Sequence, residues 1–353
     1  MLIAIIVLAG LSLLILGHEA GHFFAAKLFG LKVDEFGFGF PPRIAAWKKG
    51  ETEYSLNWLP FGGFVKISGE RGEFALQDGT AWANDAPSAP ADESRLFFAQ
   101  PAWKKSVIVL AGVIMNFLLG WIFISLVLMI GSPQTLVITG AEPGSPAAQA
   151  GFMSGDVVLN YKTYQSFTGY VDANEGKPIT VAVLRNGKEV DLTATPRVNP
   201  SPDQGALGVT LKEGGAAREN PLLALKDGFI DAALIFWLTL QAFGDLVRQI
   251  FVHATLPAGI VGPVGIFGVA EETGRIGLTY LLQLIGVISI NLTIVNLIPF
   301  PALDGGRFVM VLIEKIKGSA IPEKVEAYLN GVGFALLIAL MIFVTIRDVR
   351  GLF

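Results

Sequence analysis

Two histidines and a glutamate stand close together near the start of the chain, in a stretch that is otherwise almost wholly apolar. They are His18, Glu19 and His22, and no charged residue occurs from Met1 to Leu16. On a helix, side chains four residues apart share a face, so both histidines can bind one zinc ion. The glutamate can take a proton from the water that the zinc activates. Because ionisable groups at membrane depth are costly and usually functional, the pattern predicts a zinc enzyme inside a bilayer.

A zinc hydrolase needs a third protein ligand, since it keeps three ligands and one open position. The best candidate is Asp304, in the sequence NLIPFPALDGGR at the end of another apolar run. Pro299 and Pro301 cannot continue a regular helix, and unwound backbone at membrane depth must be buried in protein or line a cavity. Gly305 and Gly306 permit a sharp turn. We therefore expect Asp304 to turn toward the histidines.

The composition supports a membrane protein that binds its metal without sulfur. The 353 residues are 52% hydrophobic and 16% charged, whereas soluble proteins carry about 25% charged residues. There is no cysteine, and two of the three histidines lie in HEAGH. The net charge of −4 argues against nucleic acid as a partner. The N-terminus lacks a basic region and a small-residue cleavage site, so we expect it to be kept as a membrane helix.

The hydropathy pattern predicts about four membrane spans, each near the ~20 residues that a helix needs. A fifth apolar segment, 222–252, is interrupted by five charged residues. It is interpreted as amphipathic helices at the interface, with a fifth span as the alternative. The expected order is a first span at 1–29, cytoplasmic hairpins and an acidic loop at 30–105, a second span at 106–131, a small soluble domain at 132–218, an interfacial region at 219–277, a third span at 278–306, a cytoplasmic loop at 307–331, and a fourth span with the tail at 332–353.

The distribution of lysine and arginine predicts the orientation. Lys27, Lys32, Lys104 and Lys105 flank one side of the first two spans, and neither residue type occurs from 106 to 161. The N-terminus and the 132–218 domain are therefore expected outside. Arg347 and Arg350 in the tail disagree with this. HEAGH would lie in the cytoplasmic third of the membrane, since 18 residues at ~1.5 Å each descend about 27 Å.

Both extramembrane segments show strand patterns. Residues 35–67 alternate apolar and polar side chains between glycines and prolines, which indicates β-hairpins. Gly69–Ser94 is acidic and rich in Ala and Pro, as in a loop. The 132–218 domain reads as a strand, a short helix at 146–150, a second strand, a hairpin that turns at Asn186-Gly187, and a closing strand. This pattern suits a peptide-binding module.

Several polar residues in the spans have two readings. Asn291 and Asn296, on the helix that leads to Asp304, would contact a substrate backbone or act as interhelical hydrogen-bond partners. Asn116 is interpreted as a packing residue and His253 as an ordinary interface residue. A bare HExxH also occurs in proteins that bind no metal, so the matching depth of Asp304 carries much of the zinc prediction.

Together these motifs resemble the site-2 protease family of intramembrane zinc metalloproteases. GHEAGHFFAAKLFG, FGGFVKI and NLIPFPALDGGR occur in the family's order, with a PDZ-like domain between the second and third spans. The likeness covers nearly the whole chain and indicates a bacterial member with a single PDZ domain. It implies zinc held by His18, His22 and Asp304, with Glu19 as general base.

The resemblance also implies two substrate contacts. The FGGFVKI hairpin would pair its edge with an unwound substrate helix, and Gly62, Gly63 and Phe64 would lie at this contact; a simple turn is the alternative for the glycines. The PDZ domain of the family is circularly permuted, so its carboxylate-binding loop would be Gly205, Ala206, Leu207 and Gly208, leading into Val209.

The expected fold is therefore a polytopic α-helical membrane protein of about four spans, with a cytoplasmic β-hairpin region and one extracytoplasmic PDZ-like α+β domain. The expected activity is cleavage of single-span proteins of the bacterial cytoplasmic membrane, such as anti-sigma factors or signal-peptide remnants, after a site-1-type protease has trimmed them. The alternative is a non-catalytic PDZ scaffold with a structural metal; the intact Glu19 argues against it, because a structural site needs no base. A transporter would show repeated spans.

Overall fold

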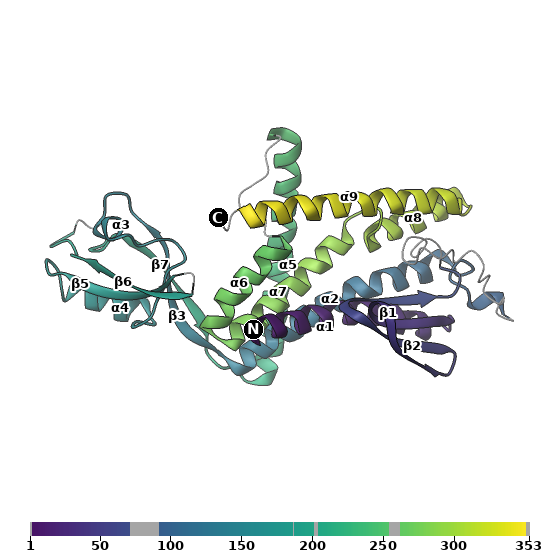
Figure 1. The fold of residues 1–353 in the computed structure, drawn as a ribbon, viewed down its shortest axis with the longest axis horizontal. Helices are drawn as coiled ribbons and strands as arrows, with labels where there is room; N and C mark the ends of the chain where they lie inside the picture. Colours follow the sequence, from purple (N-terminus) through teal and green to yellow (C-terminus); the bar gives the residue numbers. More distant parts are fainter. Residues whose placement is uncertain (1, 71–91, 186, 201–203, 254–261, 351–353) are drawn as a thin grey trace. The chain divides into compact units, whose positions relative to one another are not determined.

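The computed structural model describes residues 2–70, 92–185, 187–200, 204–253 and 262–350 (Figure 1). The chain forms two compact units, which are described separately. The first, here called the helical unit, comprises Met1–Ser125, Leu225–Ala270 and Leu282–Phe353. The second, here called the sheet unit, comprises Leu126–Ala224 and Glu271–Leu281.

The elements follow one another in the order α1 (Leu2–Leu28), β1 (Val33–Lys49), β2 (Thr52–Ile67), a 3-10 turn (Glu93–Arg95), α2 (Ala102–Ile130), β3 (Ser132–Ala141), α3 (Pro146–Ala150), β4 (Val157–Val158), α4 (Tyr164–Asp172), β5 (Ile179–Arg185), β6 (Lys188–Ala194), β7 (Val209–Ala216), α5 (Pro221–His253), α6 (Pro263–Ile276), α7 (Leu278–Leu297), α8 (Asp304–Lys317) and α9 (Glu323–Arg350).

Among the described residues, five helices are long and apolar enough to cross a membrane, one more than the four that we counted from the sequence. They are α1, α2, α5, α7 and α9. The additional one is α5, a single helix of 33 residues where we expected several interfacial helices. Its charged residues lie toward its two ends and leave an uncharged run from Ala232 to Gly244. By length and composition, α5 is therefore a fifth candidate span.

The predicted strands of 35–67 form one long, folded hairpin of β1 and β2, which lies alongside α1 in Figure 1. Residues 35–38 of β1 have partners in 63–66 and in 53–56 of β2, and 43–49 pairs with 52–57. The paired stretches therefore lie side by side in the order 43–49, 52–57, 35–38 and 63–66, which places 63–66 at one edge. Buried side chains of the hairpin pack against α1 and α2; they are Val33, Val65 and Ile67, against Ala26, Ile108 and Val109. This packing fixes the hairpin beside the helix that carries HEAGH. Most of the predicted acidic loop, 71–91, lies outside the described residues.

The sheet unit contains a five-stranded antiparallel sheet in the order β6-β5-β4-β3-β7. The short helix predicted at 146–150 is α3. Ser145 caps its N-terminus, since the Ser145 hydroxyl accepts a hydrogen bond from the N–H of Ala148. The helix α4 was not predicted from the sequence. Its capping box uses Thr163 and Ser166, whereas the usual signature has Glu or Gln at the second position. Both helices pack on a core that includes Phe167, Leu136 and Ile138.

Candidate active site

The helix α1 holds the two histidines of HEAGH one turn apart with their rings at close range. The Nε2 atoms of His18 and His22 are 3.2 Å apart. The ring of His22 is buried, and its Nδ1 lies 2.8 Å from the backbone oxygen of Ile108. Because a carbonyl only accepts, Nδ1 of His22 carries the proton and donates it. The Nε2 atom of His22 then carries a lone pair and no proton, as a metal ligand requires, and it faces Nε2 of His18.

Asp304 begins α8, directly after the unwound segment that contains the two prolines. The segment bends sharply, since Ala302 has a positive φ of 73°. Gly305 and Gly306 lie against the backbone of the preceding turn, where an added Cβ would sit 2.5 Å from the carbonyl carbon of Leu297 and 2.6 Å from that of Phe300. Only glycine allows this close approach. The predicted turn of Asp304 toward the histidines is therefore present in the fold.

Three potential ligand atoms converge at this point. The Oδ2 atom of Asp304 lies 3.1 Å from Nε2 of His18 and 3.4 Å from Nε2 of His22. Tetrahedral zinc with bonds of about 2.0–2.1 Å separates its ligands by about 3.3–3.4 Å. Asp304 is buried, and Oδ2 has no hydrogen-bond partner among the described residues. Since a buried carboxylate oxygen needs a partner, the residues present fit a zinc ion, and they form a candidate metal-binding group.

Glu19 and the hairpin lie next to this group. A Cβ added to Gly63 would be 3.5 Å from Cγ of Glu19 and 3.7 Å from a methyl carbon of Leu16. The predicted substrate-binding residue Gly63 thus lies against the predicted general base. Gly62 has a φ of 100° and faces the ring of Phe40. Phe64 covers Gly37, where an added Cβ would clash with the ring of Phe64.

The two asparagines of α7 differ in their surroundings. The Oδ1 atom of Asn291 accepts a hydrogen bond of 3.0 Å from the hydroxyl of Thr239 in α5. This contact corresponds to the interhelical role that the sequence left open. Asn296 is partly buried near the end of α7. His253 is the last residue of α5 and lies in the helical unit.

Sequence reasoning missed the part that α2 plays. Its residues 108, 112 and 116 recur every four positions, the same spacing as the two histidines. The carbonyl of Ile108 faces His22, and the carboxamide of Asn116 lies 3.2 Å from Nδ1 of His18. An added Cβ at Gly112 would sit 2.7 Å from Cε1 of His18. The periodic Gly and Asn in an apolar helix were the available signal.

The predicted carboxylate loop lies in the sheet unit, immediately before β7. Its carbonyl oxygens accept hydrogen bonds from other segments: Ala206 from the N–H of Arg197 at 2.8 Å, Leu207 from that of Ala147 at 3.0 Å, and Gly208 from that of Glu142 at 2.8 Å. Gly208 has a positive φ of 74°. Within the described part of the chain, the N–H groups of Gly205, Ala206, Leu207 and Gly208 have no acceptor. Such a row of N–H groups is able to bind an anion.

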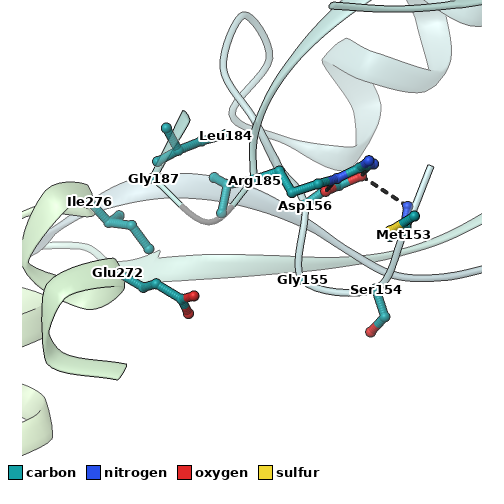
Figure 2. Close-up of a pocket in the computed structure, with 10 residues that line it drawn as sticks. Met153, Ser154, Gly155, Asp156, Leu184, Arg185, Gly187, Glu272 and Ile276 are labelled. Carbon is teal, nitrogen blue, oxygen red and sulfur yellow. Dashed lines mark hydrogen bonds and ion pairs between the residues drawn. The ribbon is translucent and has the colours of Figure 1, made fainter. Parts of the chain in front are cut away.

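A hollow of about 260 Å³ lies elsewhere in the sheet unit, lined by the turn before β4, the end of β5 and α6 (Figure 2). Asp156 is buried here and accepts hydrogen bonds from Arg185 at 2.6 Å and from the N–H of Met153 at 2.9 Å. Burial raises the pKa of Asp156, but the hydrogen bonds from Arg185 and from the N–H of Met153, with the charge of Arg185, together outweigh it and hold the pKa below its ordinary value. These charges satisfy one another, which makes the hollow a structural feature of this unit.

The candidate site and the fold define a class of protein: a metallopeptidase of the HExxH type whose two histidines lie on α1, a helix of membrane-spanning length. Comparison with known proteins agrees with this class. The model of peptidase family M50 matches residues 6–340. The chain therefore belongs to the M50 family, the site-2 proteases, and is a zinc metalloprotease.

Its relatives match along almost their whole length. A protein of Clostridium perfringens named as a zinc metalloprotease is 34% identical over 351 residues, which are 98% of this chain and 98% of the relative. The metalloprotease MmpA of Caulobacter vibrioides is 30% identical over 375 residues, covering 96% and 93%. The regulator of sigma-W protease RasP of Bacillus subtilis is 29% identical over 422 residues, covering 99% and 98%.

Proposed function

We propose that this zinc metalloprotease is an intramembrane endopeptidase that cuts the transmembrane segment of single-span membrane proteins. The observation that carries the proposal is the convergence of three ligand atoms from His18, His22 and Asp304 beside Glu19. The histidines and Glu19 lie on α1, and Asp304 follows the end of α7; both helices are of membrane-spanning length. A protease whose reacting groups lie at this depth meets peptide bonds that are themselves in the membrane.

The chemistry follows from the roles of the side chains. His18, His22 and Asp304 would hold the zinc. When bound, zinc lowers the pKa of a coordinated water toward ~7 and polarises the scissile carbonyl. Glu19, one residue from His18, takes the proton of the attacking water and passes it to the leaving amine. A structural metal site would need no base at this position.

The hairpin would present the substrate to these groups. A helical substrate hides its peptide bonds in intrahelical hydrogen bonds, so a segment has to unwind before it is cut. Pairing with a strand replaces the bonds that are lost. The stretch 63–66 is outermost in the hairpin, and Gly63 lies against Glu19. This arrangement would bring a substrate strand, guided by Gly62, Gly63 and Phe64, next to Glu19. Asn296 and the Nδ2 atom of Asn291 would face the same substrate segment.

The sheet unit would select substrates as a PDZ-like domain. The loop of Gly205–Gly208 presents N–H groups that fit a C-terminal carboxylate, such as the new end that a site-1-type protease leaves. Such trimming would give the substrate a short external tail. The relative named as regulator of sigma-W protease supports anti-sigma factors as one substrate class.

The lysine and arginine distribution supports an orientation in the bacterial cytoplasmic membrane. It would place the N-terminus and the sheet unit outside and the metal group toward the cytoplasm. This orientation is based on four crossings, in which α7 starts outside and ends toward the cytoplasm; a crossing by α5 would reverse α7 and is not part of the proposal. Labelling of single cysteines, which the chain otherwise lacks, placed in the sheet unit and in the β1–β2 turn would test it in intact cells.

The proposal is tested by cleavage in a defined membrane. The full chain and its Glu19→Gln variant are each reconstituted with a pre-trimmed single-span protein, and the products are identified by mass spectrometry. We expect wild type to cut within the transmembrane segment, and Glu19→Gln to bind zinc without cutting. Equal cleavage by both would contradict the role of Glu19. Zinc binding without cleavage of any pre-trimmed substrate would favour the alternative of a PDZ scaffold with a structural metal.

A further inference from the structure

One face of α2 lines the metal-binding group over three successive turns. Ile108 offers its carbonyl to His22, Gly112 leaves room for both imidazoles, and Asn116 places its carboxamide beside His18. Each histidine thus has its own hydrogen-bonding group on the neighbouring helix: the carbonyl of Ile108 for His22 and the carboxamide of Asn116 for His18.

The contact of Asn116 is the less expected of the two, because it uses a side chain that the apolar helix need not carry. The residue is 1% exposed, and Nδ2 of its carboxamide lies 3.2 Å from Nδ1 of His18. Its Oδ1 atom is buried without a hydrogen-bond partner among the described residues. Burying a polar group without a hydrogen bond is destabilising, so a carboxamide at this place indicates a role beyond packing.

The tautomer of His18 decides what that use is. For Nε2 to offer its lone pair to a metal beside Asp304, the ring proton has to be on Nδ1. Nδ1–H then needs an acceptor, and metal-binding histidines almost always donate this proton to an oxygen. The carboxamide of Asn116 is placed to accept it once Oδ1 faces the ring; an asparagine can exchange Oδ1 and Nδ2 by turning about its last bond.

The backbone of Asn116 is held as well. The hydroxyl of Ser289, in α7, donates a hydrogen bond of 2.7 Å to the carbonyl oxygen of Asn116. Both groups are buried. Because α7 leads into the unwound segment before Asp304, this bond links the helix that precedes the third ligand to the residue that contacts the first.

We propose that Asn116 is a positioning residue of the zinc site: it fixes the tautomer and the ring orientation of His18. The inference rests on the proposed function, in which His18 binds zinc. Loss of such a partner typically lowers metal affinity by about 10- to 100-fold. A residue that only packs between helices would leave the affinity unchanged.

The test compares Asn116→Leu, which has the same branched skeleton but no acceptor, with Asn116→Asp, which keeps an oxygen at the same reach. The control is Ser125→Ala, which removes another buried polar atom of α2 that lacks a partner in the described residues. Zinc affinity of the full-length protein in detergent is measured by competition with a chelator. The visible spectrum of the cobalt-substituted protein reports the ligand geometry, and the melting temperature reports the fold.

We expect Asn116→Leu to bind zinc about 10- to 100-fold more weakly and to change the cobalt spectrum, while Asn116→Asp and Ser125→Ala stay close to wild type. Wild-type affinity and spectrum in Asn116→Leu would overturn the inference. Should that variant fail to fold, Asn116→Asp decides: a loss of affinity in a folded Asn116→Asp protein also overturns it. A wild type that binds no zinc, or full binding by His18→Ala, would instead contradict the proposed function.

Discussion

Replacing Gly112 by alanine probes how tightly α2 is fitted to the metal-binding group. The added Cβ would lie 2.7 Å from Cε1 of His18 and 2.7 Å from Cε1 of His22, and ordinary contacts begin at 3.4 Å. The Nε2 atom of His22 would be closer still. The rings therefore have to retreat by at least about 0.7 Å, or α2 has to move by as much. Metal–ligand distances in a competent site vary by only about 0.2 Å, so the displacement is several times larger than zinc tolerates.

Two magnitudes follow for Gly112→Ala. Zinc affinity falls by about 10- to 100-fold, as for other disturbed partners of metal-binding histidines, which corresponds to about 1.4–2.8 kcal/mol. Cleavage at saturating zinc falls by up to about 100-fold, because a misplacement near 1 Å has that effect on a reacting geometry. Chelator competition measures the first quantity, and cleavage of a reconstituted substrate measures the second.

The matched control is Gly244→Ala in α5, where an added Cβ meets no atom within 4 Å. Both changes gain helix propensity, by about 1 kcal/mol each, so propensity does not separate them. We expect Gly244→Ala to keep wild-type zinc affinity and cleavage. A Gly112→Ala protein that equals Gly244→Ala in both assays would refute the close fit of α2 against the two histidines.

The remaining predictions concern the ion pairs of Glu51, in the turn between β1 and β2, and the contacts of Asp348 with the start of α6. Hydrogen bonds from Arg95 and Lys27 outweigh the effect of burial and lower the pKa of Glu51 from 4.5 to about 2. The ion pairs therefore stabilise the fold fully above pH 4.5, and this stabilisation is lost as the pH falls toward 2. The melting temperature of wild type should exceed that of Glu51→Gln at pH 7, and the difference should shrink between pH 5 and pH 3; a constant difference would speak against the ion pairs. Asp348 accepts hydrogen bonds from the N–H groups of Gly262 and Gly265 at 3.2 and 2.8 Å. Asp348→Ala should destabilise the start of α6 by about 1 kcal/mol, which faster amide hydrogen exchange in α6 would report. Asp348→Asn should keep the protection. Equal exchange in wild type and both variants would show that these hydrogen bonds are dispensable.

The metal-binding group was predictable because short-range geometry determines most of it. The four-residue spacing of His18 and His22 requires only that α1 be a helix, and the prolines before Asp304 require only that α7 end there. The length of α5 was harder to predict. Its charged residues match an interfacial helix as well as a span with polar ends, and hydropathy alone does not separate the two.

The partners of these ligands could not be predicted, because they depend on how distant segments pack. Asn116 and His18 are 98 positions apart in the sequence, and nothing local relates them. The buried ion pair of Arg307 with Glu70, at 2.6 Å, joins residues 237 positions apart. It fastens the helix that begins with Asp304 to the end of the hairpin. Sequence reasoning located both segments but gave no sign of this bond.

The most direct test of the central claim is the zinc content of purified full-length protein in which each proposed ligand is replaced in turn. We predict one zinc per chain in wild type and in Glu19→Gln, and loss of tightly bound zinc in His18→Ala, His22→Ala and Asp304→Ala proteins that remain folded. Retention of a full zinc equivalent by folded Asp304→Ala would show that the third ligand lies elsewhere. Retention by both histidine variants would contradict the account.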